Sequence, residues 1–387
     1  MRTGPVRILF VHSSSEMYGS DRCLYELVKR IDKEQFTPVI VLPFEGELSE
    51  KFRSIGVAVY ITDPWVIRKG VFRSIRFLFY ILKLPCSVIR LARIIKKEGI
   101  ALVYSNTSII VGSALSAFIT RRPHVCHIRE LYDSYPGLSR VYRSFLCRLS
   151  DRLIVISNAV ASFVNPCCPQ KINVVYDGVV LDRFIHADHK LPDVLTEWKK
   201  QKYIIISNVG RVSPIKGQEL FINAARECIK RDSKIRFLIV GDIFKGNEQY
   251  MMHLKNMVKS YGMQDHMLFT GFRDDVDDFI ESSDVIVLST LITEGLGQVV
   301  MEGMAAGKVV IAPDKGGPPE LIEHGTDGIL YRAGSRDALS HAILRAAGDP
   351  DLRKSIADKA REKAKARFGI QNNVSAIEQL IRQIVTA

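Results

Sequence analysis

A strand, a glycine loop, a helix and a second strand follow one another within residues 284–312. Residues 284–288 and 309–312 are short apolar runs rich in β-branched side chains, the pattern of buried parallel strands. Residues 298–306 between them are predicted to be a helix that stops at Gly307. The order predicts a βαβ unit whose loop lies at the carboxyl edge of a sheet. Such a loop presents backbone N–H groups and the positive end of a helix, which suit an anion.

Two acids frame this predicted anion site. Glu294 lies in the loop and Glu302 about one turn into the helix, so both can line one crevice. A carboxylate accepts paired hydrogen bonds from vicinal hydroxyls, which sugars and riboses offer. The pair therefore indicates a sugar on one side of a diphosphate and a ribose on the other. The alternative is that Glu294 caps the helix and Glu302 is an ordinary surface residue. The loop glycines, and the sequence G-G-P-P-E at 316–320, favour the first interpretation.

The whole stretch resembles the donor site of the retaining glycosyltransferases of family four. Glu294 and Glu302 have seven residues between them, the E-x7-E spacing of that family. The surrounding E-G-L-G-Q-V-V-M-E-G-M-A-A-G-K-V-V-I-A and the later G-G-P-P-E also match it. The spacing alone occurs by chance in many helices, whereas the complete stretch is specific.

The resemblance implies roles for individual residues of the C-terminal half. Glu294 would bind sugar hydroxyls and Glu302 the ribose, while the backbone of Gly295, Leu296 and Gly297 would orient sugar and phosphate. In related enzymes the loop after the strand predicted at 267–270 holds the nucleobase. Phe272 and Arg273 are therefore candidates for the base pocket.

Arg211 and Lys216 lie in a loop between an apolar strand at 203–209 and a helix that begins at Gln218. Two cations beside a helix N-terminus can neutralise a diphosphate leaving group in place of a divalent metal. A solvated basic loop is the alternative. The family motif, in which an Arg and a Lys grip the diphosphate, favours a functional loop. The resemblance implies no metal and no cofactor besides the donor. The acids at 274–278 suit the first turn of a helix better than a D-x-D metal motif.

The N-terminal half opens on another strand, loop and helix, with an apolar strand at 6–12 and a helix from Gly19. It has no G-x-G-x-x-G fingerprint, which argues against a simple dinucleotide dehydrogenase. The resemblance places this loop near the donor phosphate and the acceptor, and only Gly19 of the family's usual glycine pair is present. His127 ends a predicted strand, 124–128. It is either a satisfied core histidine or, as the family implies, a catalytic-site contact to donor sugar or acceptor.

The chain of 387 residues exceeds one ordinary core. We predict an N-terminal, acceptor-side domain over 1–185, a linker over 186–201, and a nucleotide-sugar-binding domain over 202–365. A last helix, 366–387, is expected to pack back on the first domain. The resemblance implies an α/β protein of the GT-B type, with two Rossmann-like domains whose parallel sheets face each other across a cleft.

The net charge of +12 calls for a partner or a surface. Zinc-finger spacing, aromatic RNA-recognition signatures and basic tails are absent, so we expect no nucleic acid. Residues 64–97 hold five aromatic side chains and nine Arg or Lys residues without an acid. Such a segment can lie in the headgroup region of an anionic bilayer. The alternative is a core-packed helix with a solvated basic face.

Seven cysteines lack any C-x-x-C pair, and Cys167 and Cys168 are adjacent. We expect buried or incidental thiols in a protein that resides in the reduced cytoplasm. The protein is expected to be peripheral on the inner face of the cell membrane. The longest uncharged window, 100–120, contains many polar residues. It is interpreted as a strand, a loop and a buried helix rather than a membrane span.

The resemblance implies retaining transfer of a sugar from a nucleotide diphosphate sugar to a hydroxyl acceptor, expected to be a lipid-linked or cell-surface glycan in polysaccharide biosynthesis. Two alternatives stay open: a nucleotide-sugar epimerase on the same scaffold, and a non-catalytic sugar- or lipid-binding module.

Overall fold

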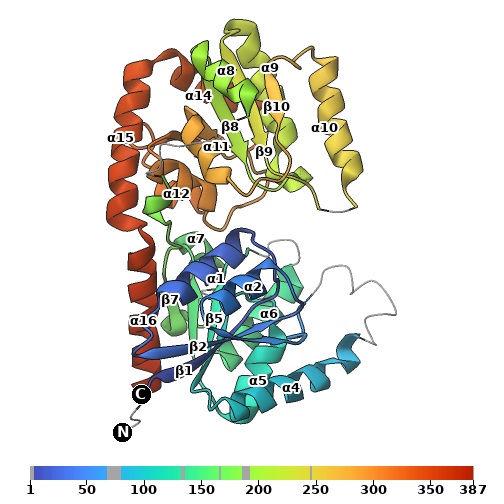
Figure 1. Cartoon of the computed structure of the whole chain (residues 1–387), viewed down its shortest axis with the longest axis vertical. Coiled ribbons are helices and arrows are strands. Elements are labelled where there is room, and N and C mark those ends of the chain that lie inside the picture. The colour runs from blue at the N-terminus through green and yellow to red at the C-terminus, as the bar shows by residue number, and fades with distance from the viewer. Residues whose placement is uncertain are drawn as a thin grey trace. The chain divides into compact units, whose positions relative to one another are not determined.

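The computed structural model describes residues 4–67, 80–131, 136–164, 167–184, 192–244 and 246–386. It divides into two compact units: unit 1 is Met1–Gly178 with Ile370–Ala387, and unit 2 is Val179–Gly369. Each unit is a parallel sheet with helices on both faces (Figure 1). The predicted α/β class with two Rossmann-like domains is confirmed.

The sheet of unit 1 has seven strands in the order β3-β2-β1-β4-β5-β6-β7, all paired in parallel. They are β1 (Val6–Val11), β2 (Phe36–Leu42), β3 (Ala58–Ile61), β4 (Leu102–Ser105), β5 (His124–Ile128), β6 (Arg152–Val155) and β7 (Ile172–Val174). Side chains of a strand alternate between the faces of its sheet. Both faces of the central strand β1 are therefore buried, which explains its unbroken apolar run.

Each face of this sheet has its own layer of helices. Ile8 and Phe10 pack with α1 (Gly19–Arg30), α2 (Glu47–Ser54) and α16 (Ile370–Thr386). Leu9 and Val11 pack on the opposite face, with α4 (Leu84–Lys97) and α5 (Val111–Thr120). Helices α6 (Pro136–Leu149) and α7 (Asn158–Val164) complete the unit.

Unit 2 repeats the arrangement with six strands in the order β10-β9-β8-β11-β12-β13. They are β8 (Ile204–Val209), β9 (Ile235–Val240), β10 (Met267–Phe269), β11 (Val285–Val287), β12 (Val309–Pro313) and β13 (Ile329–Tyr331). One face carries α9 (Gln218–Arg231), α10 (Glu248–Ser260) and α14 (Arg336–Gly348), and α8 (Asp193–Lys200) and α11 (Val276–Ser282) supply apolar side chains to the other. The remaining helices are α12 (Gln298–Ala305), α13 (Pro318–Leu321) and α15 (Pro350–Arg367).

The last helix, α16, belongs to unit 1 although the preceding helix belongs to unit 2. Its apolar residues Val374, Ile377 and Ile381 are buried in the core of unit 1. Asn373 donates a hydrogen bond from Nδ2 to the Tyr176 carbonyl at 2.7 Å. The C-terminal helix of the chain therefore packs on the sheet of unit 1.

The segment between the two sheets belongs to unit 2 by its contacts. Residues 179–184, which the sequence places in the N-terminal domain, include Arg183, whose guanidinium pairs with Asp277 of α11. In α8, Leu195 and Trp198 are buried against Ile205 of β8. Most of the predicted linker outside this helix, residues 186–191, lies outside the described residues.

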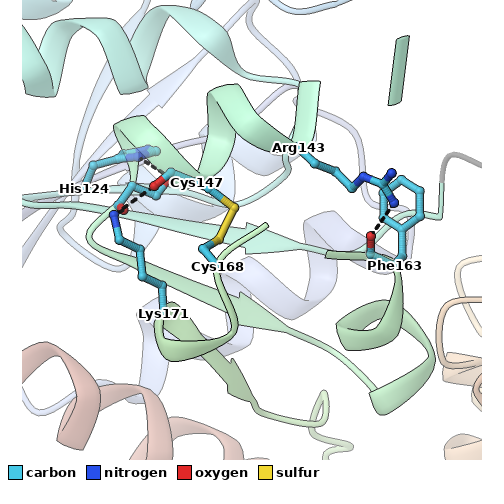
Figure 2. Close-up of a disulfide and its surroundings, with 7 residues drawn as sticks. His124, Arg143, Cys147, Phe163, Cys168 and Lys171 are labelled. Atoms are coloured by element: carbon cyan, nitrogen blue, oxygen red, sulfur yellow. Dashed lines mark hydrogen bonds between the residues drawn. A yellow bond between two sulfur atoms is a disulfide. The ribbon is translucent and has the colours of Figure 1, made fainter. Parts of the chain in front are cut away.

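The expectation that all seven cysteines are free thiols is wrong for two of them. Cys147, near the end of α6, and Cys168 form a disulfide across a Cα–Cα distance of 5.8 Å (Figure 2). They are 21 residues apart, so neither a motif nor a regular spacing marked them. Lys171 donates hydrogen bonds from Nζ to the carbonyls of Cys147 and Ser150, each at 2.8 Å, and satisfies the end of the same helix.

Candidate functional site

The strand order of unit 2 reverses between β8 and β11, and that of unit 1 between β1 and β4. In open parallel sheets ligands bind outside the carboxyl ends of the strands at such a point. Most predicted site residues of unit 2 follow β8 and β11, and Gly19 of unit 1 follows β1. His127 lies in β5, beside β4, whereas Phe272 and Arg273 follow β10 at the edge of the sheet of unit 2.

In unit 2 the loop after β8 is fixed against the loop after β11. Gly217 has a φ of +69°, and a Cβ on it would lie 2.0 Å from the Ser289 carbonyl oxygen, so only glycine fits. Ser289 donates from Oγ to the Lys216 carbonyl at 2.9 Å, and Thr290 donates from Oγ1 to the Ile215 carbonyl at 3.1 Å. The backbone of Lys216 is therefore held in one place.

Lys216 and Glu294 meet as an ion pair. Lys216 donates from Nζ to Glu294 Oε2 at 2.8 Å, and both side chains are partly exposed. An ammonium has three donors, so Lys216 keeps hydrogen-bonding capacity for an anionic ligand beside this carboxylate. Two predicted site residues that are distant in sequence are thus in direct contact.

The G-G-P-P-E segment packs directly on the acidic loop. Gly317 donates its backbone N–H to the Glu294 carbonyl at 2.9 Å. A Cβ on Gly316 would lie 2.4 Å from that carbonyl oxygen, and one on Gly317 would lie 2.4 Å from the Gly295 carbonyl oxygen. Glycines at both positions therefore allow the two segments to touch.

Gly295, Leu296 and Gly297 form the buried floor of the loop. Leu296 has only 2% of its surface exposed, so any role in donor binding falls to its backbone. Gly297 has a φ of +98° and directly precedes the first residue of α12. This left-handed turn brings the helix N-terminus to the sheet edge, where its N–H groups can bind an anion.

Arg211 stacks its guanidinium over the Phe244 ring, 3.7 Å from the centroid. Its carbonyl accepts a hydrogen bond at 3.1 Å from Nε2 of Gln218, the first residue of α9. Aromatic packing holds an arginine side chain in one orientation while its N–H groups remain able to donate. Both predicted cations are thus anchored in the same loop.

Glu302 lies in α12 with its side chain 12% exposed, 3.9 Å from Nη1 of Arg183. Arg183 also donates from Nε to Asp277 Oδ2 at 2.7 Å. No local pattern linked Arg183 to Glu302 or Asp277, because these partners lie far along the chain. An ionised carboxylate accepts hydrogen bonds through both oxygens, which suits the hydroxyls of a ribose.

The two base-pocket candidates differ in their surroundings. Phe272 is 56% exposed. Arg273 donates from Nε to Asp275 Oδ1 at 2.7 Å, and this hydrogen bond lowers the pKa of Asp275. Asp277 and Asp278 lie in the first turn of α11, as predicted. Among the described residues no group of three or more His, Cys, Asp or Glu side chains could hold a metal ion.

In unit 1, Gly19 is the first residue of α1, and a Cβ built on it has no atom within 4 Å. Glycine is therefore not demanded by packing there, and it leaves space in front of the helix. Asp21 accepts the Tyr18 backbone N–H at 2.9 Å and also pairs with His12. His12 in turn accepts a hydrogen bond at Nδ1 from the Asn106 amide at 3.1 Å.

His127 is fully buried in β5, next to Tyr104 of β4. Its Nδ1 lies 2.6 Å from the Tyr104 hydroxyl and 3.3 Å from Nη2 of Arg129. Burial, and then the Arg129 cation, hold the pKa of His127 well below its ordinary value. Arg129 is held by Asp177, whose two carboxylate oxygens lie 2.5 and 2.6 Å from Nη1. The sequence did not predict this Arg–Asp pair, because the partners are 48 residues apart.

Family models match both halves of the chain. Residues 17–183 match the family described as Glycosyltransferase Family 4, and residues 196–363 match the one described as Glycosyl transferases group 1. In structure, the chain resembles Anabaena Alr3699/HepE in complex with UDP, with a TM-score of 0.82 and 23% identity over 98% of this chain and 100% of that one.

Curated relatives are similar in sequence over different lengths. The UDP-Gal:alpha-D-GlcNAc-diphosphoundecaprenol alpha-1,3-galactosyltransferase of Escherichia coli is 27% identical over 98% of this chain and 97% of its own length. The Alpha-D-kanosaminyltransferase of Streptomyces kanamyceticus is 29% identical over 46% of each chain. In several such relatives the match spans only about half to two thirds of the relative's length. The two family matches together extend over most of both units, so the chain belongs to the family 4 and group 1 glycosyltransferases and has their GT-B fold.

Proposed function

We propose that this protein transfers a hexose from a nucleotide diphosphate sugar to a hydroxyl acceptor with retention of anomeric configuration and without a metal ion. The observation that carries the proposal is the Lys216–Glu294 ion pair at the switch point of unit 2. It joins a cation suited to the diphosphate with a carboxylate suited to the sugar hydroxyls. Arg211 of the same loop supplies a second cation, and Glu302 one turn into α12 supplies the ribose contact.

In the proposed reaction the bond from the anomeric carbon to the diphosphate oxygen breaks as the acceptor oxygen bonds to the same face of that carbon. The acceptor proton goes to an oxygen of the departing β-phosphate. Arg211 and Lys216 stabilise the negative charge that develops on the diphosphate. Glu294 orients the sugar through its hydroxyls and forms no covalent intermediate.

The proposed acceptor is lipid-linked. The name of the Escherichia coli relative describes a sugar on diphosphoundecaprenol, an acceptor that resides in a membrane. None of the described helices is long and apolar enough to cross a bilayer. We place the enzyme at the cytoplasmic face of a membrane, in contact with its surface, where it would reach such an acceptor.

A basic and apolar face on unit 1 supports this placement. Helices α4 and α5 lie side by side (Figure 1), and Ser116 of α5 donates from Oγ to the Val88 carbonyl of α4. Leu82 is 64% exposed and Phe118 68% exposed. Neither residues 80–97 nor residues 109–122 contain an acid. Exposed cations lie on the same two helices or at their ends: Lys83, Arg90, Arg93, Lys96, Lys97 and Arg121.

Not all side chains of residues 64–97 support membrane contact. Trp65 is buried, stacks on Tyr80 at 5.1 Å between ring centroids and donates from Nε1 to the Tyr80 carbonyl. It is therefore a core residue, in line with the alternative interpretation of this segment. Arg68, Lys69, Arg73 and Arg76 lie outside the described residues.

Changing Lys83, Arg90 and Arg93 together to Gln should release the protein from anionic vesicles. Each basic residue near an anionic surface contributes on the order of 1 kcal/mol, so three account for roughly a hundredfold in partitioning. Cosedimentation with anionic and neutral vesicles at low and high salt measures the effect, which salt should weaken. The charge-matched control changes Lys230, Lys255 and Lys259 of unit 2 to Gln and should bind like the wild type. Equal binding to neutral vesicles would show that charge does not hold the protein there.

A thermal-shift screen tests the proposed function itself. A nucleotide sugar at 100 times its dissociation constant should stabilise the protein by about 2.7 kcal/mol, while free sugars should not. UDP-sugars are the first probes, since the Escherichia coli relative is named for one. Release of a free 2-epimer without an acceptor would instead identify an epimerase. Binding of sugars or lipids with no turnover of any nucleotide sugar would identify a non-catalytic module.

A further inference from the structure

A buried polar chain crosses the carboxyl edge of the sheet in unit 1. From the Asn106 amide it runs to Arg129, since Nη2 donates to Asn106 Oδ1 and Nε to the Asn106 carbonyl, each at 3.3 Å. From Arg129 it continues to Asp177 on one side and to Nδ1 of His127 on the other. The side chains of Arg129 and Asp177 are each only 8% exposed. Arg129 is thus the branch point of the network.

Arginine fixes the direction of these hydrogen bonds. A guanidinium has five N–H donors and no acceptor, so Nδ1 of His127 can only accept from it. Burial lowers the pKa of Arg129, but the Asp177 carboxylate, together with Cys23 and Tyr104, opposes it, and the net effect is a raised pKa. Arg129 therefore stays charged and stays a donor. Burial likewise raises the pKa of Tyr104, which remains a neutral hydroxyl able to share the same ring nitrogen.

The proton of the neutral imidazole must then reside on Nε2. Nε2 is buried and has no hydrogen-bond partner among the described residues. A buried N–H without a partner is unfavourable, and such groups in native structures demand an explanation. In a ligand-binding sheet edge the simplest explanation is that the partner is the ligand.

We infer that Arg129, held by Asp177, is a positioning residue that keeps His127 neutral with its proton on Nε2, so that Nε2–H donates to a hydroxyl or phosphate oxygen of the substrate. The inference rests on the proposed function for the identity of the ligand, and on the contacts of unit 1 for the position of the proton. It assigns His127 a donor role and excludes it as the general base of the reaction, because Nε2 offers a proton and Nδ1 is occupied. This agrees with a mechanism in which the leaving phosphate accepts the acceptor's proton.

The direct test is the tautomer of His127 in the protein without substrate. Long-range ¹H–¹⁵N spectra of histidine-labelled protein distinguish protonation at Nε2 from protonation at Nδ1, and His127→Gln assigns the signals. The wild type and Arg129→Lys, whose ammonium can also only donate, should show Nε2–H. Arg129→Met combined with Asp177→Asn removes the donor without leaving a buried charge, and should release the fixed tautomer. A signal from Nδ1–H in the wild type would overturn the inference.

Tyr104→Phe separates the two partners of Nδ1. Because Arg129 still donates, His127 should keep Nε2–H in this variant. A switch to Nδ1–H would show that Tyr104, and not Arg129, determines the tautomer of His127.

In transfer assays the Arg129→Met, Asp177→Asn double variant should lose at least tenfold in kcat with an unchanged dissociation constant for the bare nucleotide. Arg129→Lys should keep most of the wild-type kcat. Equal losses of kcat in Arg129→Lys and in the double variant, at equal melting temperature, would show that Arg129 has only a structural role.

The same experiments keep the inference apart from the proposed function. The spectra need no substrate, so Nε2–H in a protein that transfers no sugar would refute the function and leave the proton assignment standing. Sugar transfer by a protein whose His127 carries Nδ1–H would refute the proton assignment and leave the proposed function standing.

Discussion

Changing Arg211 or Lys216 to Ala should lower kcat/KM for sugar transfer by two or more orders of magnitude. Each change removes a cation that stabilises the charge on the leaving diphosphate, and an anchored donor of this kind is worth about 3 kcal/mol in the transition state. Both side chains are anchored, Lys216 through its backbone bonds to Ser289 and Arg211 through Phe244. Most of the loss should appear in kcat, because the charge on the diphosphate grows as the bond breaks.

Two cations of α9 provide matched controls. Arg226 stacks on Tyr261 at 4.2 Å much as Arg211 stacks on Phe244, and Lys230 is an exposed lysine paired with Glu227. Their Ala variants should keep wild-type turnover, which separates the loss of charge at the site from the loss of an arginine or lysine as such. Steady-state kinetics with EDTA present in every assay tests metal independence in the same experiment. Full activity of the variant with both Arg211 and Lys216 changed to Ala would refute the proposal that these two cations stabilise the leaving diphosphate.

Much of the fold could be predicted from local sequence, because parallel strands buried on both faces are continuous apolar runs. The predicted strand 124–128 coincides with β5, and the helix predicted at 298–306 differs from α12 by one residue. The apolar run 39–42 predicts a strand that starts at Val39, whereas β2 starts three residues earlier, at Phe36. Pro38 lies within those residues, and proline in a strand argues against that assignment from sequence.

The contacts of the candidate site could be predicted only in part. Short-range features, such as the glycine before α12 and the acids at the start of α11, follow from turn and helix chemistry. The pairs Arg129–Asp177 and Arg183–Glu302 depend on which loops the sheet order brings together. Strand order is a tertiary property, and no local pattern in the chain encodes it. The Cys147–Cys168 disulfide escaped prediction because neither a motif nor a regular spacing marks the pair.

Variants of Glu302 and Glu294 should differ in which ligand they bind more weakly, the bare nucleotide or the nucleotide sugar. Glu302→Gln should raise the dissociation constant of the bare nucleoside diphosphate about tenfold, because a hydrogen bond between a charged carboxylate and the ribose is worth roughly 1.5–3 kcal/mol. Arg183 should stay in place in this variant, since Asp277 still holds it. The weakening should therefore report the ribose contact rather than a rearranged α11.

Glu294→Gln should leave bare nucleotide binding unchanged or slightly tighter, because Lys216 loses a competing anion 2.8 Å away. Binding of the nucleotide sugar should weaken by about tenfold to a hundredfold, as the carboxylate that accepts the sugar hydroxyls is gone. Isothermal titration with nucleoside diphosphate and with nucleotide sugar measures both constants for each variant. Glu219→Gln, which breaks the exposed pair between Glu219 of α9 and His253 of α10, is the control and should change neither constant. If both site variants lose the bare nucleotide equally, Glu294 does not face the sugar, and the orientation of the donor across the Lys216–Glu294 pair has to be reversed.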